Sequence, residues 1–156
     1  MNGFIKKTTP VGFLNAKRRP MANHESVLVF SRAVPPYNPQ GLLPYGKINR
    51  GTTSKNYRSA GKTSFAKWTN YPKSIIEFKR DADKLHSTQK PVALMEYLIL
   101  TYTNEGDTVL DNCMGSGTTG VACYHTNRKF IGIEKNPNYY SIAFIVTGKQ
   151  IGRAHV

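Results

Sequence analysis

The stretch that decides the fold is LDNCMGSGTTGVACYHTNRKFIGIE, residues 110–134. The short apolar run that leads into it, residues 108–110, predicts a buried strand that ends at Asp111. The glycine-rich run 115–120 follows at once and predicts a tight turn, and a helical pattern starts at Val121. The chain therefore passes from a strand through a glycine turn into a helix.

A second strand is predicted at the end of this stretch. Residues 130–133 are mostly apolar and end on Glu134. A strand, a glycine turn, a helix and a second strand with a terminal acid are typical of the first half of a nucleotide-binding α/β sheet. The glycines let the backbone approach a ligand closely, and Glu134 is placed to accept hydrogen bonds from a ribose.

The run GSGTTG also fits the G-x-G-x-x-G pattern of dinucleotide-binding proteins, so an NAD-type site is one alternative. Asp111 argues against it, because its carboxylate would repel a pyrophosphate at the start of the helix. The same carboxylate would attract the ammonium and sulfonium groups of S-adenosylmethionine. A P-loop is excluded because no Gly-Lys-Ser/Thr follows the glycines, and a turn without any ligand remains a further alternative.

A second motif, HSTQKP, occupies residues 86–91 and leads into a helical pattern over residues 92–100. Pro91 suits the first turn of that helix, and Ser87 or Thr88 can cap it. Two further motifs follow in order, GDTVLDNCMGSGTTGVA and RKFIGIEKNPNYYSIA. With these three motifs, the chain over residues 84–143 resembles the permuted DNA amino-methyltransferases, which transfer a methyl group from S-adenosylmethionine to adenine N6 or cytosine N4.

The resemblance implies a cofactor site for S-adenosylmethionine and a role for each matching residue. In this family the first motif lines one side of the cofactor, the glycine motif lines the other side, and the acid after the second strand binds the ribose hydroxyls. Carried over to this chain, the cofactor-binding residues are Thr88, Gln89, Lys90, Asp111, Gly115, Ser116, Gly117, Thr118, Thr119 and Glu134.

The charge of the chain is divided unevenly along its length. The net charge is +13 and the isoelectric point is about 9.9. Residues 1–80 hold 15 lysines and arginines against 2 acids, whereas residues 81–156 hold 7 of each. A basic region of this kind predicts a polyanionic partner. The division suits an enzyme with one small ligand and one nucleic-acid substrate.

Residues 38–83 combine cations with interleaved aromatic side chains, among them Tyr45 and Trp68. One alternative is a solvated, partly disordered loop. We favour a target-recognition insertion whose cations contact DNA phosphates and whose aromatic side chains stack or wedge. The candidate DNA-binding residues are Lys47, Arg50, Lys55, Arg58, Lys62 and Lys67.

Residues 1–37 are interpreted as late strands of the catalytic subdomain. Phe13 and Leu14 end a short predicted strand, and residues 27–30 predict the buried centre of a second one. His24 and Glu25 are interpreted as a hydrogen-bonding pair at a strand end rather than as functional groups.

The sequence VPPY, residues 34–37, resembles the family's catalytic motif, in which Asp, Asn or Ser precedes Pro-Pro-Tyr. Val34 has no hydrogen-bond acceptor to hold the target amine. The permuted order also places several strands after the catalytic motif, yet only residues 74–78 are strand-like before the HSTQKP motif. We interpret the segment as a turn, assign no catalytic residue, and expect the chain alone to be inactive.

The cysteines, the lack of a targeting segment and the C-terminal tail complete the sequence analysis. Cys113 and Cys123 do not form a disulfide framework or a zinc-ligand spacing, so no metal site is expected. No signal peptide or membrane-spanning window is present, and a reducing cytoplasm is expected. Residues 147–156 form an atypical tail that does not match the family.

The sequence thus predicts an α/β fold, a partial Rossmann-like methyltransferase sheet with a basic loop-rich insertion. The chain is interpreted as the C-terminal portion of a DNA amino-methyltransferase, with a cofactor-binding subdomain at residues 84–146 and double-stranded DNA as its partner. The alternatives are a non-catalytic DNA-binding remnant and an NAD-binding oxidoreductase. The recognition sequence, the target base, homodimer formation and a restriction partner stay open.

Overall fold

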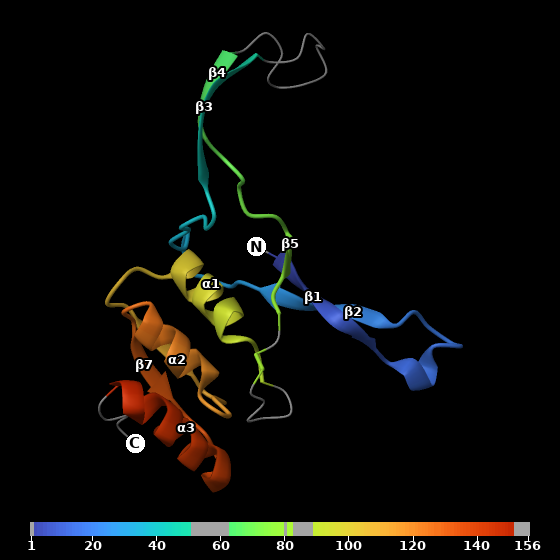
Figure 1. Ribbon diagram of the computed structural model, residues 1–156, viewed down its shortest axis with the longest axis vertical. Coiled ribbons are helices and arrows are strands. Elements are labelled where there is room, and N and C mark those ends of the chain that lie inside the picture. The colour runs from blue at the N-terminus through green and yellow to red at the C-terminus, as the bar shows by residue number, and fades with distance from the viewer. Residues whose placement is uncertain (1, 51–62, 80, 83–88, 152–156) are drawn as a thin grey trace. The chain divides into compact units, whose positions relative to one another are not determined.

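The computed structural model describes residues 2–50, 63–79, 81–82 and 89–151 (Figure 1). The chain divides into two compact units. The first contains residues 1–38 and 74–156, and the second contains Pro39–Lys73. Each unit is described by itself below. The second unit is shorter than the predicted insertion at residues 38–83, because residue 38 and residues 74–83 belong with the first unit.

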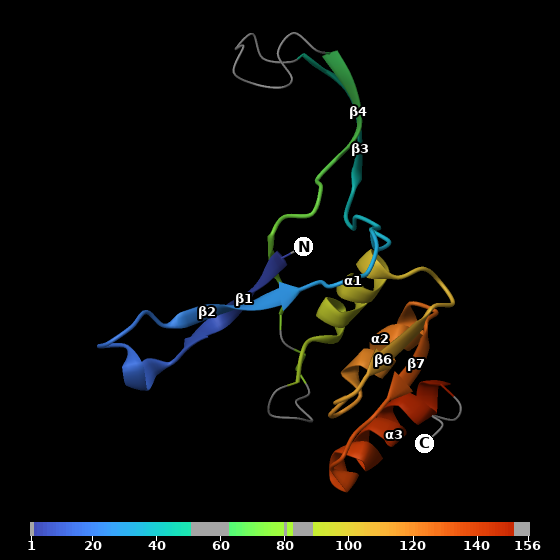
Figure 2. The same ribbon diagram turned by 180° about the vertical axis from the view of Figure 1, so that it is seen from behind.

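The region with the glycine-rich turn has the predicted strand–helix–strand order (Figure 2). Strand β6 (Thr108–Asp111) pairs in parallel with strand β7 (Lys129–Gly132), and helix α2 (Thr118–His125) makes the crossover between them. Helix α1 (Val92–Tyr102) precedes β6, and helix α3 (Pro137–Ile151) follows β7. The predicted α/β class is confirmed.

The core of the first unit lies between the helices and one face of this parallel pair. Ile99, Ala122 and Cys123 form its buried centre. The half-buried side chains that pack against this centre are Val92, Met95, Val109 and Phe130. A Cβ atom at Gly120 of α2 would lie 2.6 Å from Thr147 Cγ2 and 2.8 Å from the Phe130 ring, so only glycine lets α2 approach α3 and β7 this closely.

The predicted buried strand at residues 108–110 lies in β6 but is not fully buried, and of the predicted strand at residues 27–30 only residues 27–28 lie in a strand. Leu110 is 60% exposed and Ile131, its partner in β7, is 51% exposed. Successive side chains of a strand point to opposite faces of the sheet. In this strand pair Val109 and Phe130 therefore pack against the helical core, while their neighbours along each strand point away from it.

Helix α1 starts differently from the prediction. Pro91 is the N-cap with extended backbone angles rather than the first helical residue, and the carboxylate of Asp81 accepts a hydrogen bond of 3.1 Å from the Val92 N–H. The predicted capping residues Ser87 and Thr88 lie outside the described residues. A helix has unsatisfied N–H groups at its start, and here an acid eleven residues upstream of Val92 satisfies one of them.

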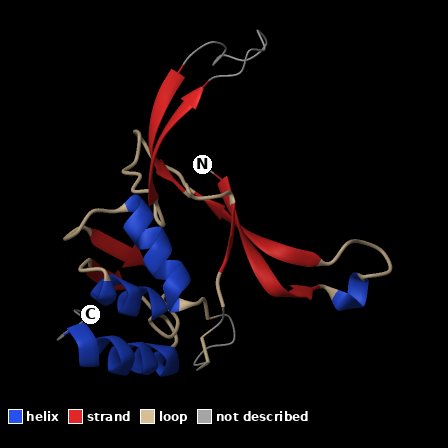
Figure 3. Ribbon diagram, turned by 45° about the horizontal axis from the view of Figure 1, so that its top comes forward, coloured by secondary structure: helices blue, strands red, loops and turns tan. Residues whose placement is uncertain are grey.

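A separate three-stranded sheet has the order β2-β1-β5. Strand β1 (Asn2–Val11) pairs antiparallel with β2 (Ala22–Leu28) and parallel with β5 (Ile75–Glu77). The prediction that Phe13 and Leu14 end a strand is wrong, because they lie in the short 3₁₀ helix η1 (Phe13–Asn15) at the end of the β1–β2 hairpin (Figure 3). Strand β2 ends at Leu28, so Phe30 lies beyond it and is 86% exposed.

The second unit contains an antiparallel pair, strand β3 (Leu43–Arg50) and strand β4 (Thr63–Thr69). The register shifts between Pro44 and Lys47, where Gly46 has a φ of 61°. Glycine adopts this left-handed conformation without strain, so it accommodates the irregularity in the strand. The predicted loop-rich insertion therefore has an ordered strand pair in its described part.

Candidate cofactor-binding site

Two acids lie at the carboxyl ends of the parallel strands. Asp111 is the last residue of β6, pairs in register with Gly132 of β7, and Glu134 follows two residues later. In open α/β sheets, ligands bind at this end of the strands. The strand pairing therefore brings two carboxylates that are 23 residues apart in the sequence to the same edge.

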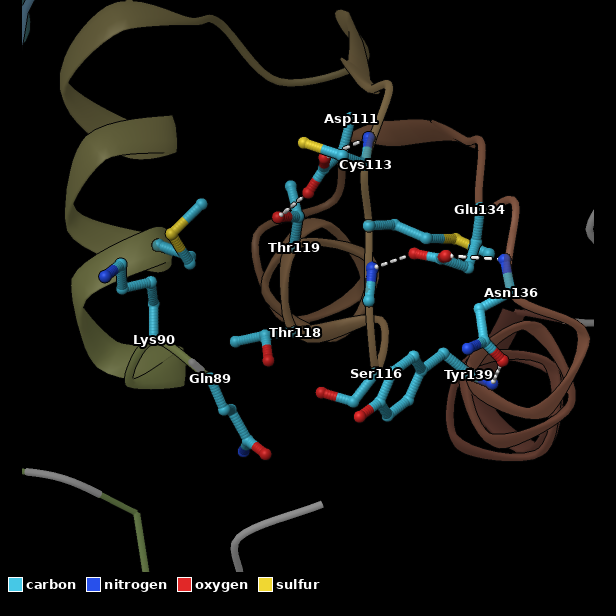
Figure 4. A pocket seen from close by; sticks show the side chains of 13 residues that line it. Gln89, Lys90, Asp111, Cys113, Ser116, Thr118, Thr119, Glu134, Asn136 and Tyr139 are labelled. Carbon is cyan, nitrogen blue, oxygen red and sulfur yellow. Dashed lines mark hydrogen bonds between the residues drawn. The ribbon is translucent and has the colours of Figure 1, made fainter. Parts of the chain in front are cut away.

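The Asp111 carboxylate is fixed by two donors. One oxygen accepts a hydrogen bond of 3.1 Å from the Cys113 N–H, and the other accepts one of 2.6 Å from the Thr119 hydroxyl (Figure 4). The first bond orients the turn after β6, and the second connects the acid to the first turn of α2.

Glu134 connects the glycine turn to the segment before α3. Its Oε2 accepts a hydrogen bond of 2.9 Å from the Gly115 N–H, and its Oε1 accepts one of 2.8 Å from the Asn136 N–H (Figure 4). Hydrogen bonds to a charged carboxylate are among the stronger ones in proteins. Glu134 therefore shapes the turn and also faces the space that the turn borders.

The turn itself requires glycine at two positions. Gly115 has a φ of 55° and Gly117, the N-cap of α2, has a φ of 84°. A Cβ atom at Gly117 would lie 3.0 Å from the Cβ of Ala143 in α3. A larger residue at Gly117 would meet both an unfavourable backbone conformation and α3, so the turn requires its two glycines.

A pocket of about 560 Å³ opens between the start of α1, the glycine turn and the start of α3. It brings together eight of the ten predicted cofactor-binding residues, with Gln89 and Lys90 across the pocket from Glu134 (Figure 4). Gly117 shapes the turn without lining the pocket, and Thr88 lies outside the described residues. The eight are Gln89, Lys90, Asp111, Gly115, Ser116, Thr118, Thr119 and Glu134.

Five lining residues were missed by the sequence analysis. Asn136 and Tyr139 lie in the motif KNPNYY directly after Glu134, and this proximity was the available signal. Met95 faces the pocket from α1, and only the packing of α1 beside α2 reveals it. Cys113 and Met114 complete the set from the turn after β6. Together they add apolar and aromatic surface to a site whose predicted residues were mostly polar.

Lys90 is held by an acid from the hairpin. Its ammonium group lies 2.6 Å from Glu25 Oε2, and Lys7 Nζ lies 2.9 Å from Glu25 Oε1. The bond from Lys90 and then that from Lys7 lower the pKa of the Glu25 carboxyl below its ordinary value of 4.5. The adjacent His24 contacts the Phe4 ring edge-on at 5.1 Å. Glu25 therefore connects the three-stranded sheet to the rim of the pocket.

The VPPY segment lies outside regular secondary structure, and the residues that line the pocket do not include it. Val34 is 95% exposed, and the ring of Tyr37 lies 6.2 Å from that of Tyr102 at the end of α1. The Asn38 amide donates hydrogen bonds to the carbonyls of Leu100 and Thr103. These contacts attach the segment to the end of α1.

Two of the six candidate DNA-binding residues have described side chains. Lys47 Nζ lies 5.1 Å from the Tyr45 ring centre, and Lys67 Nζ lies 5.4 Å from the Trp68 ring centre. Arg50 is the last residue of β3, but its side chain is not described. Lys55, Arg58 and Lys62 lie outside the described residues.

The two cysteines occupy different environments. Cys113 is exposed and lines the pocket, whereas Cys123 is fully buried in the core. Burial raises the pKa of the Cys123 thiol to about 11. Cys123 is therefore a packing residue. Across the described ranges, helices long and apolar enough to cross a membrane are absent, as are clusters of side chains suited to a metal ion.

Comparison with known proteins identifies the family to which the chain belongs. The profile of the DNA methylase family N6_N4_Mtase matches residues 1–144, so the chain belongs to that family. Among curated relatives, the Type II methyltransferase M.HpaI of Haemophilus parainfluenzae is 43% identical over 90 residues, which cover 57% of this chain and 29% of that protein. The Type II methyltransferase M2.DpnII of Streptococcus pneumoniae is 52% identical over 58 residues, 37% of this chain and 22% of that protein.

Among solved structures, the chain is similar to the complex of M1.HpyAVI with SAM. The TM-score is 0.60 at 30% identity, and the match covers 93% of this chain and 60% of that one. The chain thus spans between about a fifth and a third of the two curated relatives, and somewhat more than half of the solved structure.

Proposed function

We propose that this chain carries the cofactor-binding part of a DNA amino-methyltransferase that uses S-adenosylmethionine and modifies the exocyclic amino group of adenine or cytosine. One observation carries the proposal. Two carboxylates, Asp111 and Glu134, stand at the carboxyl ends of adjacent parallel strands on either side of a glycine turn, in a pocket of about 560 Å³. Small-molecule pockets have volumes of about 300–1,000 Å³.

The chemistry of the lining residues fits this cofactor. S-adenosylmethionine has an ammonium group, a sulfonium, a ribose diol and an adenine ring. Asp111 would hold the ammonium group, because a carboxylate accepts about four hydrogen bonds and two are used by Cys113 and Thr119. Glu134 would accept from the ribose hydroxyls. Met95, Met114 and Tyr139 supply apolar surface for the adenine.

When bound, the cofactor supplies a methyl group that is electrophilic because it is attached to a sulfonium. The residues of this chain bind and orient, and the rate advantage of such a site comes largely from alignment of the two reactants. The Thr119 hydroxyl and the Cys113 N–H fix the Asp111 carboxylate, and backbone N–H groups fix Glu134. We assign no residue of this chain to hold the target amine.

The proposal extends to the substrate. Duplex DNA is the polyanion that a net charge of +13 favours, and the cations of β3 and β4 are our candidates for its phosphates. The cytoplasm, where DNA and reduced thiols coexist, is the compartment that we propose.

Calorimetric titration with S-adenosylhomocysteine tests the cofactor site. Loss of a hydrogen bond to a charged group costs about 1.5–3 kcal/mol, so Asp111→Ala and Glu134→Ala should each weaken binding roughly 10- to 150-fold. Glu105→Ala removes an exposed acid outside the pocket and is the matched control. Unchanged affinity in both site variants would remove the assignment.

Alkylation of Cys113 gives a second measurement on the same chain. The Cys113 thiol lines the pocket, so S-adenosylhomocysteine should slow its reaction with iodoacetamide, while Cys123 stays unmodified. Reduced nicotinamide dinucleotide is the comparison ligand. Protection by the nicotinamide compound but not by S-adenosylhomocysteine would favour the dinucleotide-binding alternative.

The isolated chain should not methylate DNA. Val34 replaces the polar residue of the family's catalytic motif, is 95% exposed, and offers no acceptor for the target amine. The measurement is transfer of tritium from labelled cofactor to mixed-sequence duplex DNA. Incorporation above background that Asp111→Ala abolishes would contradict the prediction and restore VPPY as a working site.

A further inference from the structure

The tip of the β1–β2 hairpin is a small ordered structure. After β1 ends at Val11, Gly12 takes a φ of 95° and the chain enters η1. Four backbone hydrogen bonds of 2.9–3.0 Å then hold the turn, two of them from the amides of Arg18 and Arg19 to the carbonyl of Asn15. The Val11–Ala22 pair closes the hairpin behind it. The side chains of the tip are therefore presented on a backbone that is already folded.

This ordered tip exposes apolar side chains. Phe13 is 79% exposed, Leu14 is 95% exposed, and Met21 is 38% exposed. Phe13 and Leu14 gain little from the fold of their own hairpin, because most of each side chain stays in water. Burial of Phe and Leu side chains is favourable, so a partner that covers them would bind more tightly.

The same tip carries three adjacent cations, Lys17, Arg18 and Arg19, all exposed. The four ion pairs found in the described part of the chain do not involve them. The only acid in residues 1–37 is Glu25, which is engaged by Lys7 and Lys90. Among the described residues, no ion pair therefore compensates the charge of the tip.

We propose that this tip, residues 12–21, is a second DNA-contacting element, separate from the β3–β4 insertion. Its three cations contact phosphates, and Phe13 and Leu14 enter the minor groove as an apolar wedge. Cations placed on phosphates beside an inserted Phe or Leu are the arrangement with which proteins bind and kink the minor groove. The inference rests on the proposed function, because it names a further contact with the same substrate.

The alternatives fit the tip less well. A second copy of this chain would bring another surface of net positive charge against three uncompensated cations. Duplex DNA instead supplies a negative charge about every 1.7 Å of its axis, and base steps between which an apolar side chain can insert from the minor groove. The combination of charge and apolar side chains on one turn therefore selects DNA over a second copy.

The experiment uses the whole 156-residue chain and a fluorescent mixed-sequence duplex, with affinity measured by anisotropy at several salt concentrations. The cation variant is Lys17→Gln, Arg18→Gln, Arg19→Gln. Its matched control is Arg32→Gln, Lys129→Gln, Lys135→Gln, which removes the same charge from other exposed positions of this unit. If three phosphate contacts are lost, the slope of log affinity against log salt should decrease by about 2.7.

The apolar variant is Phe13→Ser, Leu14→Ser, and its control is Phe144→Ser, Ile145→Ser on the exposed face of α3. The tip variant should weaken DNA binding at least about tenfold without changing the salt slope, because it removes buried apolar surface and no charge. Melting temperatures should match the wild type, since these side chains do not support the fold.

The outcomes separate this inference from the proposed function. If the wild type binds DNA and a Lys47→Gln, Lys67→Gln variant reduces the salt slope, but the tip variants match their controls, the tip is not a contact and the proposed substrate stands. If the wild type does not bind duplex DNA, both fail. Loss of a dimer in sedimentation with Phe13→Ser, Leu14→Ser, with DNA affinity unchanged, would assign the tip to a second copy and overturn the inference.

Discussion

The cofactor-binding region and the β3–β4 insertion differ in where their apolar side chains lie. Every buried apolar residue among the described ones belongs to α1, α2 or α3: Leu94, Ile99, Val121, Ala122, Cys123 and Ala143. In the insertion, Ile48 is 69% exposed and its cross-strand partner Phe65 is 65% exposed. The first region is shaped by its own packing. The described part of the second exposes the apolar side chains of its strand pair.

The two regions also differ in the contacts that their charged side chains make. In the cofactor-binding region the acids Asp111 and Glu134 are oriented by backbone and hydroxyl donors. In the insertion, Lys47 and Lys67 lie over aromatic rings, and the ion pairs among the described residues do not include them. An ammonium group over an aromatic face keeps its charge available to a phosphate. The first arrangement fits the small cationic ligand that we propose, and the second fits the polyanion that we propose.

The largest effect expected from this comparison concerns stability. Leu94 is 1% exposed in α1, so Leu94→Ala should lower the free energy of unfolding by about 2–5 kcal/mol. Leu43 of β3 is 55% exposed, and Leu43→Ala should change it by less than about 0.5 kcal/mol. Urea unfolding followed by circular dichroism measures both. Equal losses would show that the insertion has a core of its own and would end the contrast.

A smaller effect concerns DNA. Lys47→Gln together with Lys67→Gln should make the slope of log affinity against log salt shallower by about 1.8. Across a fourfold change in salt, this difference in slope corresponds to roughly a tenfold difference in affinity. The affinity for S-adenosylhomocysteine should not change. Lys129→Gln with Lys135→Gln is the charge-matched control. A slope that stays the same would mean that β3 and β4 do not contact phosphates.

The smallest effect concerns the acid that links the hairpin sheet to the pocket. Because Lys90 and Lys7 lower the pKa of Glu25 when the chain is folded, its contribution to stability is present above its ordinary pKa of 4.5. This contribution is lost as the pH falls through the lowered pKa. The Glu25 side chain is 37% exposed, so solvent screening keeps the effect below about 1 kcal/mol.

The stability contribution of Glu25 is measured by the pH dependence of the melting temperature below pH 4.5. The wild type should lose more stability on acidification than Glu25→Gln, and Glu105→Gln, an exposed acid of the same unit, should follow the wild type. Identical acid profiles for the wild type and Glu25→Gln would show that the pairs with Lys7 and Lys90 do not stabilise the fold.

Local patterns in the sequence were enough to predict the strand–turn–helix–strand order around Gly115. They failed where a residue distant in the sequence caps a helix or brings a side chain to the pocket. The cap of α1 comes from Asp81, and Met95 reaches the pocket because α1 packs beside α2. Phe13 and Leu14 were predicted to end a strand but lie in a 3₁₀ helix. The sequence does not separate the two cases, because an apolar pair in a 3₁₀ turn has the same local pattern as a strand end.

By itself, then, the sequence determined the class of fold, the family resemblance and most of the polar residues of the pocket, because glycine turns and terminal acids act over a few residues. Only the tertiary structure decided which faces of the strands are covered, that Glu134 holds the Gly115 amide, and that Glu25 holds Lys90. Those features depend on pairing and packing between segments that are 19 and 65 residues apart, and no local pattern encodes such contacts.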